Sequence, residues 1–80
     1  SVPLVVDDLT GNGINVVFTM TQSETDPTAI AVFIGGVYQQ PTTNYTVSGT
    51  AITFTSPPPA PGINPNRITI VHNLNSTDAA

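Results

Sequence analysis

The fold is decided by residues 32–54, which begin VFIGGVYQQP at residues 32–41 and end YTVSGTAITF at residues 45–54. Gly35-Gly36 can adopt the positive φ angles of a two-residue hairpin turn, and apolar strand-forming residues flank it on both sides. Ser48-Gly49 predicts a second such turn, because apolar and polar residues alternate strictly on both sides of it. We therefore expect two successive hairpins of an antiparallel sheet.

Strand signals recur at short intervals outside this stretch. Residues 3–6 predict a short strand, and Pro3, which cannot donate to a ladder, confines it to a sheet edge or to the start of a strand. Residues 8–13 predict a turn. Apolar residues alternate at positions 14, 16, 18 and 20, and a polar loop follows at residues 21–28. Residues 29–34 are apolar on both faces, which predicts a central strand. Residues 67–73 predict the last strand, with Ile68 and Ile70 facing inward.

About seven short strands separated by turns predict an all-β fold, a small antiparallel β-sandwich that is immunoglobulin-like in architecture. A small barrel or jelly roll is the alternative. One domain is expected over residues 1–80. Residues 56–65 contain five of the eight prolines and predict a stiff surface connection. Residues 74–80 carry no periodic signal and predict a tail that is flexible or held by a partner.

Composition limits what the chain can do. A domain of 80 residues buries only about 60% of its unfolded surface, and without cysteine it has no disulfide to reinforce it, so oligomerisation is expected. The net charge is −4, with Arg67 as the single basic residue. Binding to nucleic acid or to an anionic membrane requires several basic residues, so we expect neither. A single His and no Cys predict no metal site and no cofactor.

The titratable residues do not form a convincing catalytic set. His72 has no evident nucleophile or orienting partner, so we expect a structural or surface role for it and predict that the protein is not an enzyme. Asp7-Asp8 and the pair Glu24 and Asp26 offer the two carboxylates that glycoside hydrolysis or calcium binding would need. Their spacing does not match a calcium loop, and solvated loops are the favoured interpretation.

A glycan or partner contact is the remaining candidate site. Tyr38 and Tyr45 can stack on a sugar ring, and Gln39, Gln40 and Asn44 offer hydrogen bonds beside them. The same tyrosines can instead pack at the edge of the core with the hydroxyl in water, which is the commoner role.

The chain resembles a small β-module of bacteriophage virion proteins that occurs in tail fibres, spikes and other appendages. The matching segments are residues 11–13, 18–19, 32–39, 45–49, 52–55 and 68–70, together with the proline-rich segment and Gly62. The module often has Asp-Gly or Asn-Gly where this chain has Gly35-Gly36, and the proline-rich segment here is longer.

The resemblance implies a virion structural part exposed on the particle surface, with other capsid or appendage subunits as partners and no catalytic residues. A homo-oligomer is expected, with a trimer favoured. A capsid decoration (cement) protein is favoured if 80 residues are the whole gene product, and a tail-fibre or spike module if they are not. The alternative function is a carbohydrate-binding module for host surface glycans.

Overall fold

A computed structural model describes residues 3–62 and 67–74 of the chain. Within these residues it contains six strands and one short 3-10 helix, η1. In chain order they are β1 (Val5–Thr10), β2 (Val17–Glu24), η1 (Pro27–Ala29), β3 (Ala31–Ile34), β4 (Val37–Gln39), β5 (Tyr45–Phe54) and β6 (Arg67–His72). Of the predicted tail, only Leu74 lies among the described residues.

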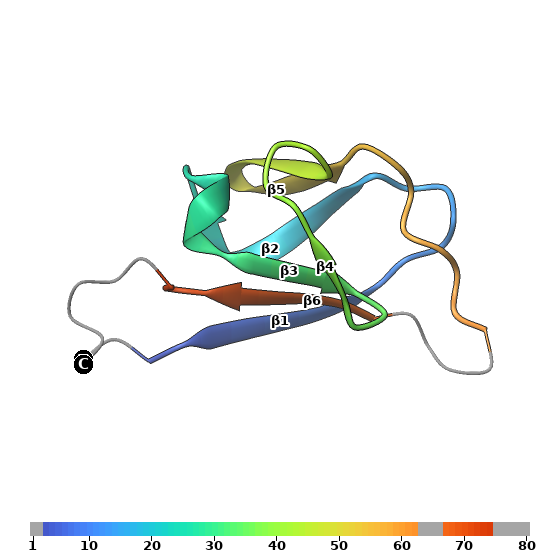
Figure 1. Cartoon of the computed structure of the whole chain (residues 1–80), viewed down its shortest axis with the longest axis horizontal. Coiled ribbons are helices and arrows are strands. Elements are labelled where there is room, and N and C mark those ends of the chain that lie inside the picture. Colours follow the sequence, from blue (N-terminus) through green and yellow to red (C-terminus); the bar gives the residue numbers. More distant parts are fainter. Residues whose placement is uncertain (1–2, 63–66, 75–80) are drawn as a thin grey trace.

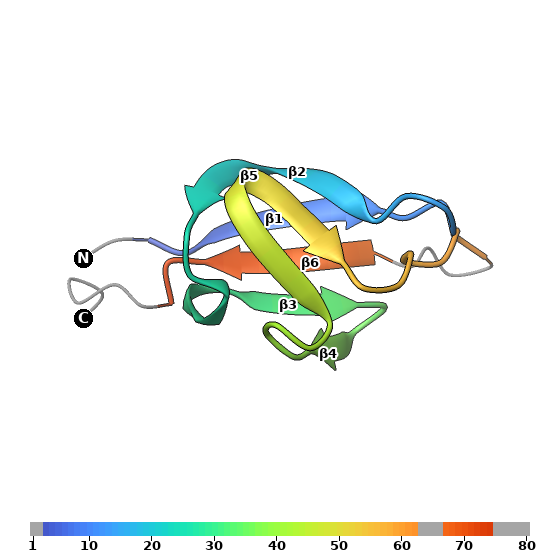
Figure 2. The ribbon, with the colours of Figure 1, turned by 90° about the horizontal axis from the view of Figure 1, so that it is seen from above.

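The strands form two antiparallel sheets stacked face to face (Figure 1). One sheet has four strands in the order β1-β6-β3-β4, and the other pairs β2 with β5. Seen from above, β2 and β5 lie across the four-stranded sheet at an angle, which is the expected result of the twist of both sheets (Figure 2). The prediction of an all-β fold with the form of a small sandwich is confirmed, and the immunoglobulin-like architecture stays a prediction.

An apolar core fills the space between the sheets. Its members are Met20, Ile30, Val32, Tyr45, Ile52, Phe54, Ile68 and Ile70. Phe18 packs edge-on against Phe54, with ring centroids 5.9 Å apart and the planes at 73°. Burying each large apolar side chain contributes about 1.5–3 kcal/mol, so this cluster is the main source of stability. The predicted inward positions of Ile68 and Ile70 are confirmed, whereas Ile14 is exposed.

The first predicted hairpin is confirmed. Gly35 and Gly36 have φ angles of 57° and 81°, and the turn pairs Ile34 with Val37. Left-handed backbone at two successive positions is the type I′ geometry that matches strand twist, and it favours glycine at both. Residues 31–34 also form an interior strand of the sheet, as the run of apolar residues predicted.

The second predicted hairpin is wrong, because β5 runs without a turn from Tyr45 to Phe54. Gly49 has a φ of 60°, and beside it the register of β5 against β2 shifts. Tyr45 is buried on the odd-numbered side before Gly49, whereas Ile52 and Phe54 are buried on the even-numbered side after it. The glycine therefore changes which alternate residues face the core and leaves six described strands instead of seven.

The predicted loops at residues 8–13 and 21–28 are shorter than expected. β1 continues to Thr10 and β2 continues to Glu24. Asp7, Asp8 and Glu24 consequently lie in strands, and Asp7 and Glu24 are buried. Their interpretation as solvated loop residues is wrong, because both carboxylates have a partner inside the protein.

The described part of the proline-rich segment packs against the turn between β1 and β2. Pro58 is buried, and its carbonyl oxygen accepts a 2.8 Å hydrogen bond from the Gly13 amide. A Cβ atom at Gly11 would lie 2.6 Å from the same oxygen, so only glycine allows this approach. The predicted surface connection is thus anchored at Pro58, and residues 63–66 lie outside the described residues.

Candidate functional site

The predicted contact residues do not form one surface. Tyr38 is exposed on β4 and packs edge-on against Phe33, with ring centroids 6.0 Å apart. Gln40 is exposed in the following turn, where its backbone N–H donates a 2.8 Å hydrogen bond to Asn44 Oδ1. Gln39 and Asn44 are half-buried.

Tyr45 cannot take part in a glycan platform. Its side chain lies in the core, and its hydroxyl donates a 2.7 Å hydrogen bond to the carbonyl oxygen of Pro27 in η1. Burial raises the pKa of this hydroxyl to about 12, so it keeps its proton over the whole neutral range. The pairing of Tyr38 with Tyr45 as two stacking rings is therefore wrong.

Gln39 and Asn44 do line a common pocket of about 250 Å³. The remaining lining residues are Ile34, Phe54, Thr55, Ser56, Pro57, Pro58 and Pro59. The pocket carries amide and hydroxyl groups beside apolar atoms and no ionisable side chain. Such a lining suits an uncharged polar ligand.

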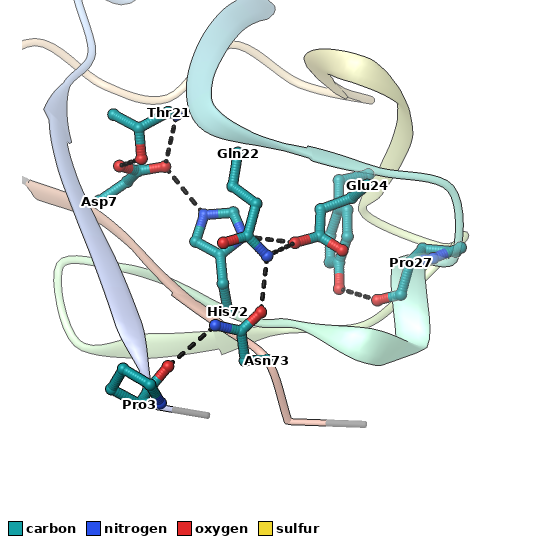
Figure 3. Close-up of polar contacts among 9 residues, drawn as sticks. Pro3, Asp7, Thr21, Gln22, Glu24, Pro27, His72 and Asn73 are labelled. Carbon is teal, nitrogen blue, oxygen red and sulfur yellow. Dashed lines mark hydrogen bonds and ion pairs between the residues drawn. The ribbon is translucent and has the colours of Figure 1, made fainter. Parts of the chain in front are cut away.

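The groups that do carry acid–base chemistry meet at the opposite side of the core, in a buried cluster of Asp7, Glu24 and His72 (Figure 3). Each comes from a different strand: β1, β2 and β6 respectively. His72 Nδ1 lies 2.6 Å from Glu24 Oε2, and His72 Nε2 lies 2.8 Å from Asp7 Oδ2. The His72 ring, which is 0% exposed, thereby joins the two sheets. We call these three residues the Asp–His–Glu cluster.

Neighbouring polar groups hold both carboxylates in place. Thr21 donates to Asp7 twice, from its amide at 3.0 Å and from its hydroxyl at 2.6 Å. Gln22 Nε2 donates to Glu24 Oε2 at 3.0 Å and to Asn73 Oδ1 at 2.6 Å. Asn73 has a φ of 72° and donates from Nδ2 to the Pro3 carbonyl oxygen at 2.9 Å (Figure 3). No buried side-chain nitrogen or oxygen of the described residues lacks a partner.

The charges of the cluster follow from this geometry. Burial by itself raises the pKa of Asp7, but the hydrogen bonds from Thr21 and the adjacent His72 ring outweigh it, and the pKa of Asp7 lies below its usual value. A neutral imidazole would turn one lone pair toward a carboxylate oxygen. Because each ring nitrogen faces such an oxygen, one proton must lie in each of the two contacts between the His72 ring and the carboxyl groups.

This arrangement does not suit catalysis. A general base needs a ring nitrogen that can reach a substrate, and both nitrogens of His72 are occupied inside a closed core. The cluster fits a structural role, as an ion pair with two hydrogen bonds that ties three strands together. We expected His72 to be either a structural or a surface residue, and the structure shows that it is buried.

Alternation along the strands contains the signal for this cluster. Asp7 shares its side of β1 with Val5 and Leu9, and His72 shares its side of β6 with Ile68 and Ile70. Polar residues at inward positions of three strands indicate a buried polar contact, because each needs a partner once it leaves water. The signal was missed because the two acids were assigned to loops.

Of the three remaining acids, Asp78 lies outside the described residues, and Asp8 and Asp26 lie apart from the cluster. Asp8 is exposed on β1, and Asp26 accepts hydrogen bonds from the amide and the hydroxyl of Thr28 at the start of η1. Those bonds lower the pKa of Asp26. Among the residues that the structure describes, no group of three or more acidic, His or Cys side chains is placed to hold a metal ion. The same residues include no helix long and apolar enough to cross a membrane.

Comparison with known proteins gave no match to any family model, curated protein or solved structure.

Proposed function

We propose that this chain is a non-enzymatic structural protein of a bacteriophage particle, exposed on the virion surface and present as a homo-oligomer among other virion proteins. The Asp–His–Glu cluster is the observation that supports a non-enzymatic role. In it, the single imidazole and two of the five acids join β1, β2 and β6. The residues best suited to acid–base chemistry thus serve assembly of the fold.

The placement in a virion is supported by the sequence resemblance. Most of the matching residues lie in the β3–β4 hairpin and in β5. A capsid decoration protein and a tail-fibre or spike module both need what this fold supplies, a small rigid unit with a surface low in charge. We favour decoration.

Mass spectrometry of purified phage particles tests this proposal. The chain contains one Arg and no Lys, so digestion uses chymotrypsin or an Asp-specific protease in place of trypsin. We expect peptides of this chain at a copy number comparable to that of a capsid or tail subunit. Abundance in infected cells together with absence from purified particles would overturn the proposal.

Glycan binding is the second candidate function, and the pocket that contains Gln39 and Asn44 favours it. Neutral donors and acceptors beside Phe54 and the prolines match the chemistry of a sugar. Titration calorimetry against host surface polysaccharide tests it, with Gln39→Ala as the pocket variant and Tyr38→Ala as the comparison outside the pocket. Saturable binding that Gln39→Ala weakens and Tyr38→Ala leaves unchanged would support this function, and no heat with the unmodified chain would exclude it for that polysaccharide.

A further inference from the structure

The pocket of about 250 Å³ contains two side-chain amides whose orientation is fixed by the backbone. Gln39 Nε2 donates a 3.1 Å hydrogen bond to the Val37 carbonyl oxygen. Asn44 Oδ1 accepts a 2.8 Å hydrogen bond from the Gln40 backbone N–H. A carbonyl oxygen only accepts and a backbone N–H only donates, so neither amide can be turned over without losing its bond. The groups that remain are an acceptor, Gln39 Oε1, and a donor, Asn44 Nδ2.

Both remaining groups are open to a ligand. Within the part of the chain that the structure describes, Gln39 Oε1 and Asn44 Nδ2 take no part in a hydrogen bond. Because every buried side-chain nitrogen and oxygen of that part has a partner, these two unpaired atoms are accessible to solvent. Both side chains line the pocket, so a ligand that displaces its water must replace the hydrogen bonds of one acceptor and one donor.

The walls of the pocket are anchored to the rest of the fold. Asn44 donates from its backbone N–H to the Gln40 carbonyl oxygen at 2.9 Å. Its own carbonyl oxygen accepts from the Thr55 N–H at 3.0 Å. On the other wall, Pro58 is buried and accepts the hydrogen bond from Gly13. A ligand therefore meets groups that are already in place, and few of them lose freedom when it binds.

A secondary amide is the ligand group that complements this pair of atoms. Its N–H can donate to Gln39 Oε1, and its carbonyl oxygen can accept from Asn44 Nδ2. A carboxylate has no hydrogen for Gln39 Oε1, and an ammonium group has no lone pair for Asn44 Nδ2. The net charge of −4 further disfavours a carboxylate. A sugar hydroxyl can serve either atom, but only an acetamido group also brings a methyl group to Ile34, Phe54 and the prolines.

We propose that the pocket binds the acetamido group of an N-acetylated sugar. The inference rests on glycan binding, the second candidate function, and names the class of sugar that this site takes. The pocket is smaller than the roughly 300–1,000 Å³ of a site for a drug-sized ligand, so it accommodates one sugar residue and not an oligosaccharide. The same size favours an acetamido group, which ends in a methyl group, over a peptide bond, whose chain continues in both directions.

A single contact of this kind is weak. Two hydrogen bonds and one methyl group, on a ligand of the size of one sugar, predict a Kd on the order of 1 mM. Many copies on one particle, as the proposed function requires, would bind a glycan with repeated acetamido groups far more tightly. Each further contact would then form at a high effective concentration.

NMR titration of the 80-residue chain tests the inference. The two probes are methyl N-acetylglucosaminide and methyl glucoside, which differ only in an acetamido group and a hydroxyl group at the same carbon. We expect saturable shifts of the side-chain amide signals of Gln39 and Asn44 with the first probe. The second probe should bind at least about tenfold more weakly, because it lacks the amide hydrogen bonds and the methyl group.

Asn44→Asp and Asn12→Asp form a matched pair of variants. Each keeps the Oδ1 atom that accepts from the backbone, from Gln40 in the first case and from Ile14 and Asn15 in the second. Each also adds one negative charge, but only Asn44→Asp replaces a donor of the pocket by an acceptor. Asn44→Asp should weaken binding of the acetamido sugar by at least about tenfold, whereas Asn12→Asp should bind it like the unmodified chain.

Circular dichroism confirms the fold of each variant, and Gln39→Met, which removes the acceptor, takes the place of Asn44→Asp if that variant unfolds. The inference is overturned by equal binding of the two glycosides, by no shift with either of them, or by unchanged binding in the pocket variant. Tighter binding of N-acetylalanine methylamide would also overturn it and would assign the pocket to a peptide.

The calorimetry with host polysaccharide described above separates these failures from failure of glycan binding itself. Polysaccharide binding without a preference for the acetamido sugar retains glycan binding and overturns this inference. The absence of binding to the polysaccharide and to both glycosides overturns both.

Discussion

Two groups of buried side chains hold the sheets together, and they follow different rules. The apolar core joins β2 and β5 to the four-stranded sheet through contacts that have no preferred direction, so its members can adjust to one another. The Asp–His–Glu cluster joins β1, β2 and β6 through bonds that need each partner in place. Equal burial therefore does not mean equal consequences: loss of one cluster residue leaves its buried polar partners unpaired, whereas loss of apolar atoms leaves a cavity but no unpaired polar group.

The largest expected effect comes from removing the centre of the cluster. His72→Leu leaves the carboxyl groups of Asp7 and Glu24 buried without their shared imidazole partner and should lower the free energy of unfolding by about 3–5 kcal/mol. Urea denaturation measures this loss. The triple replacement of Asp7, Glu24 and His72 by Leu removes all charges together and should recover most of the stability. Equal stability of His72→Leu and the unmodified chain would contradict the proposed contacts of the cluster.

The matching change in the apolar core is Ile70→Ala, two residues away on the same strand. The cavity should cost about 2–5 kcal/mol. Because no charge changes, the loss should be the same at pH 7 and at pH 4, whereas the loss caused by His72→Leu should shrink at low pH as the carboxylates accept protons. Urea denaturation of both variants at the two pH values distinguishes the apolar core from the Asp–His–Glu cluster. A pH-dependent loss of stability in Ile70→Ala would contradict the distinction between them.

Acid should weaken the cluster and leave the core unaffected. The pKa of Asp7 is lower in the folded protein than in the unfolded chain, so its carboxylate stabilises the fold above the usual Asp value near ~3.9. That contribution is lost as the pH falls through the lower pKa of the folded state. Thermal melts from pH 7 to pH 2 should show a declining Tm below about pH 4. In Asp7→Asn the Tm should fall less steeply below about pH 4. If the Tm of this variant falls as steeply as that of the unmodified chain, other groups cause the acid sensitivity.

A smaller change tests the support of the cluster. Thr21→Val removes the 2.6 Å hydroxyl bond to Asp7 and keeps the backbone bond from the same residue. We expect a loss of about 1 kcal/mol and a higher pKa for Asp7, so that acid unfolding begins at a higher pH. Thr21→Ser retains the hydroxyl and serves as the control. NMR titration of the Asp7 carboxyl carbon gives the pKa directly, and identical titrations of the two variants would exclude the role of the hydroxyl.

The smallest effect is expected from Tyr45→Phe, which removes the one polar contact of the apolar core, to the Pro27 carbonyl oxygen. The ring stays, so the loss should be about 1 kcal/mol. Ultraviolet titration should show one tyrosine that ionises only near pH 12, as expected from the raised pKa of Tyr45. If the ionisation near pH 12 is absent in Tyr45→Phe, it belongs to Tyr45. If it is still present in that variant, it belongs to another residue.

Much of the fold was predictable from local patterns. Alternating apolar residues and the Gly35-Gly36 turn correctly gave an all-β chain, the β3–β4 hairpin and the inward side of β6. The second hairpin was predicted wrongly, because a glycine with positive φ serves equally well in a turn and in a register shift inside a strand. Which of the two Gly49 adopts depends on pairing with β2, more than twenty residues earlier.

The cluster could not be predicted from local patterns alone. Asp7 and His72 are 65 positions apart, and a polar residue in a short segment resembles a loop residue until its partners are known. Gln39 and Asn44 were proposed for their amides, and the structure places both in one pocket, but the burial of Tyr45 follows from contacts across the core.

The position of β6 has a consequence for synthesis of the chain. β6 lies between β1 and β3 and pairs with both, although it is the last of the six described strands in the sequence. β2 and β5 leave the ribosome before β6 and can pair first, but the four-stranded sheet stays incomplete until residues 67–72 emerge. Until then β1 has no neighbour among the described strands of its sheet. Folding should therefore finish after translation of β6, with the closure between β1 and β6 as its slow step, because pairing across so long a loop must overcome the largest loss of chain entropy.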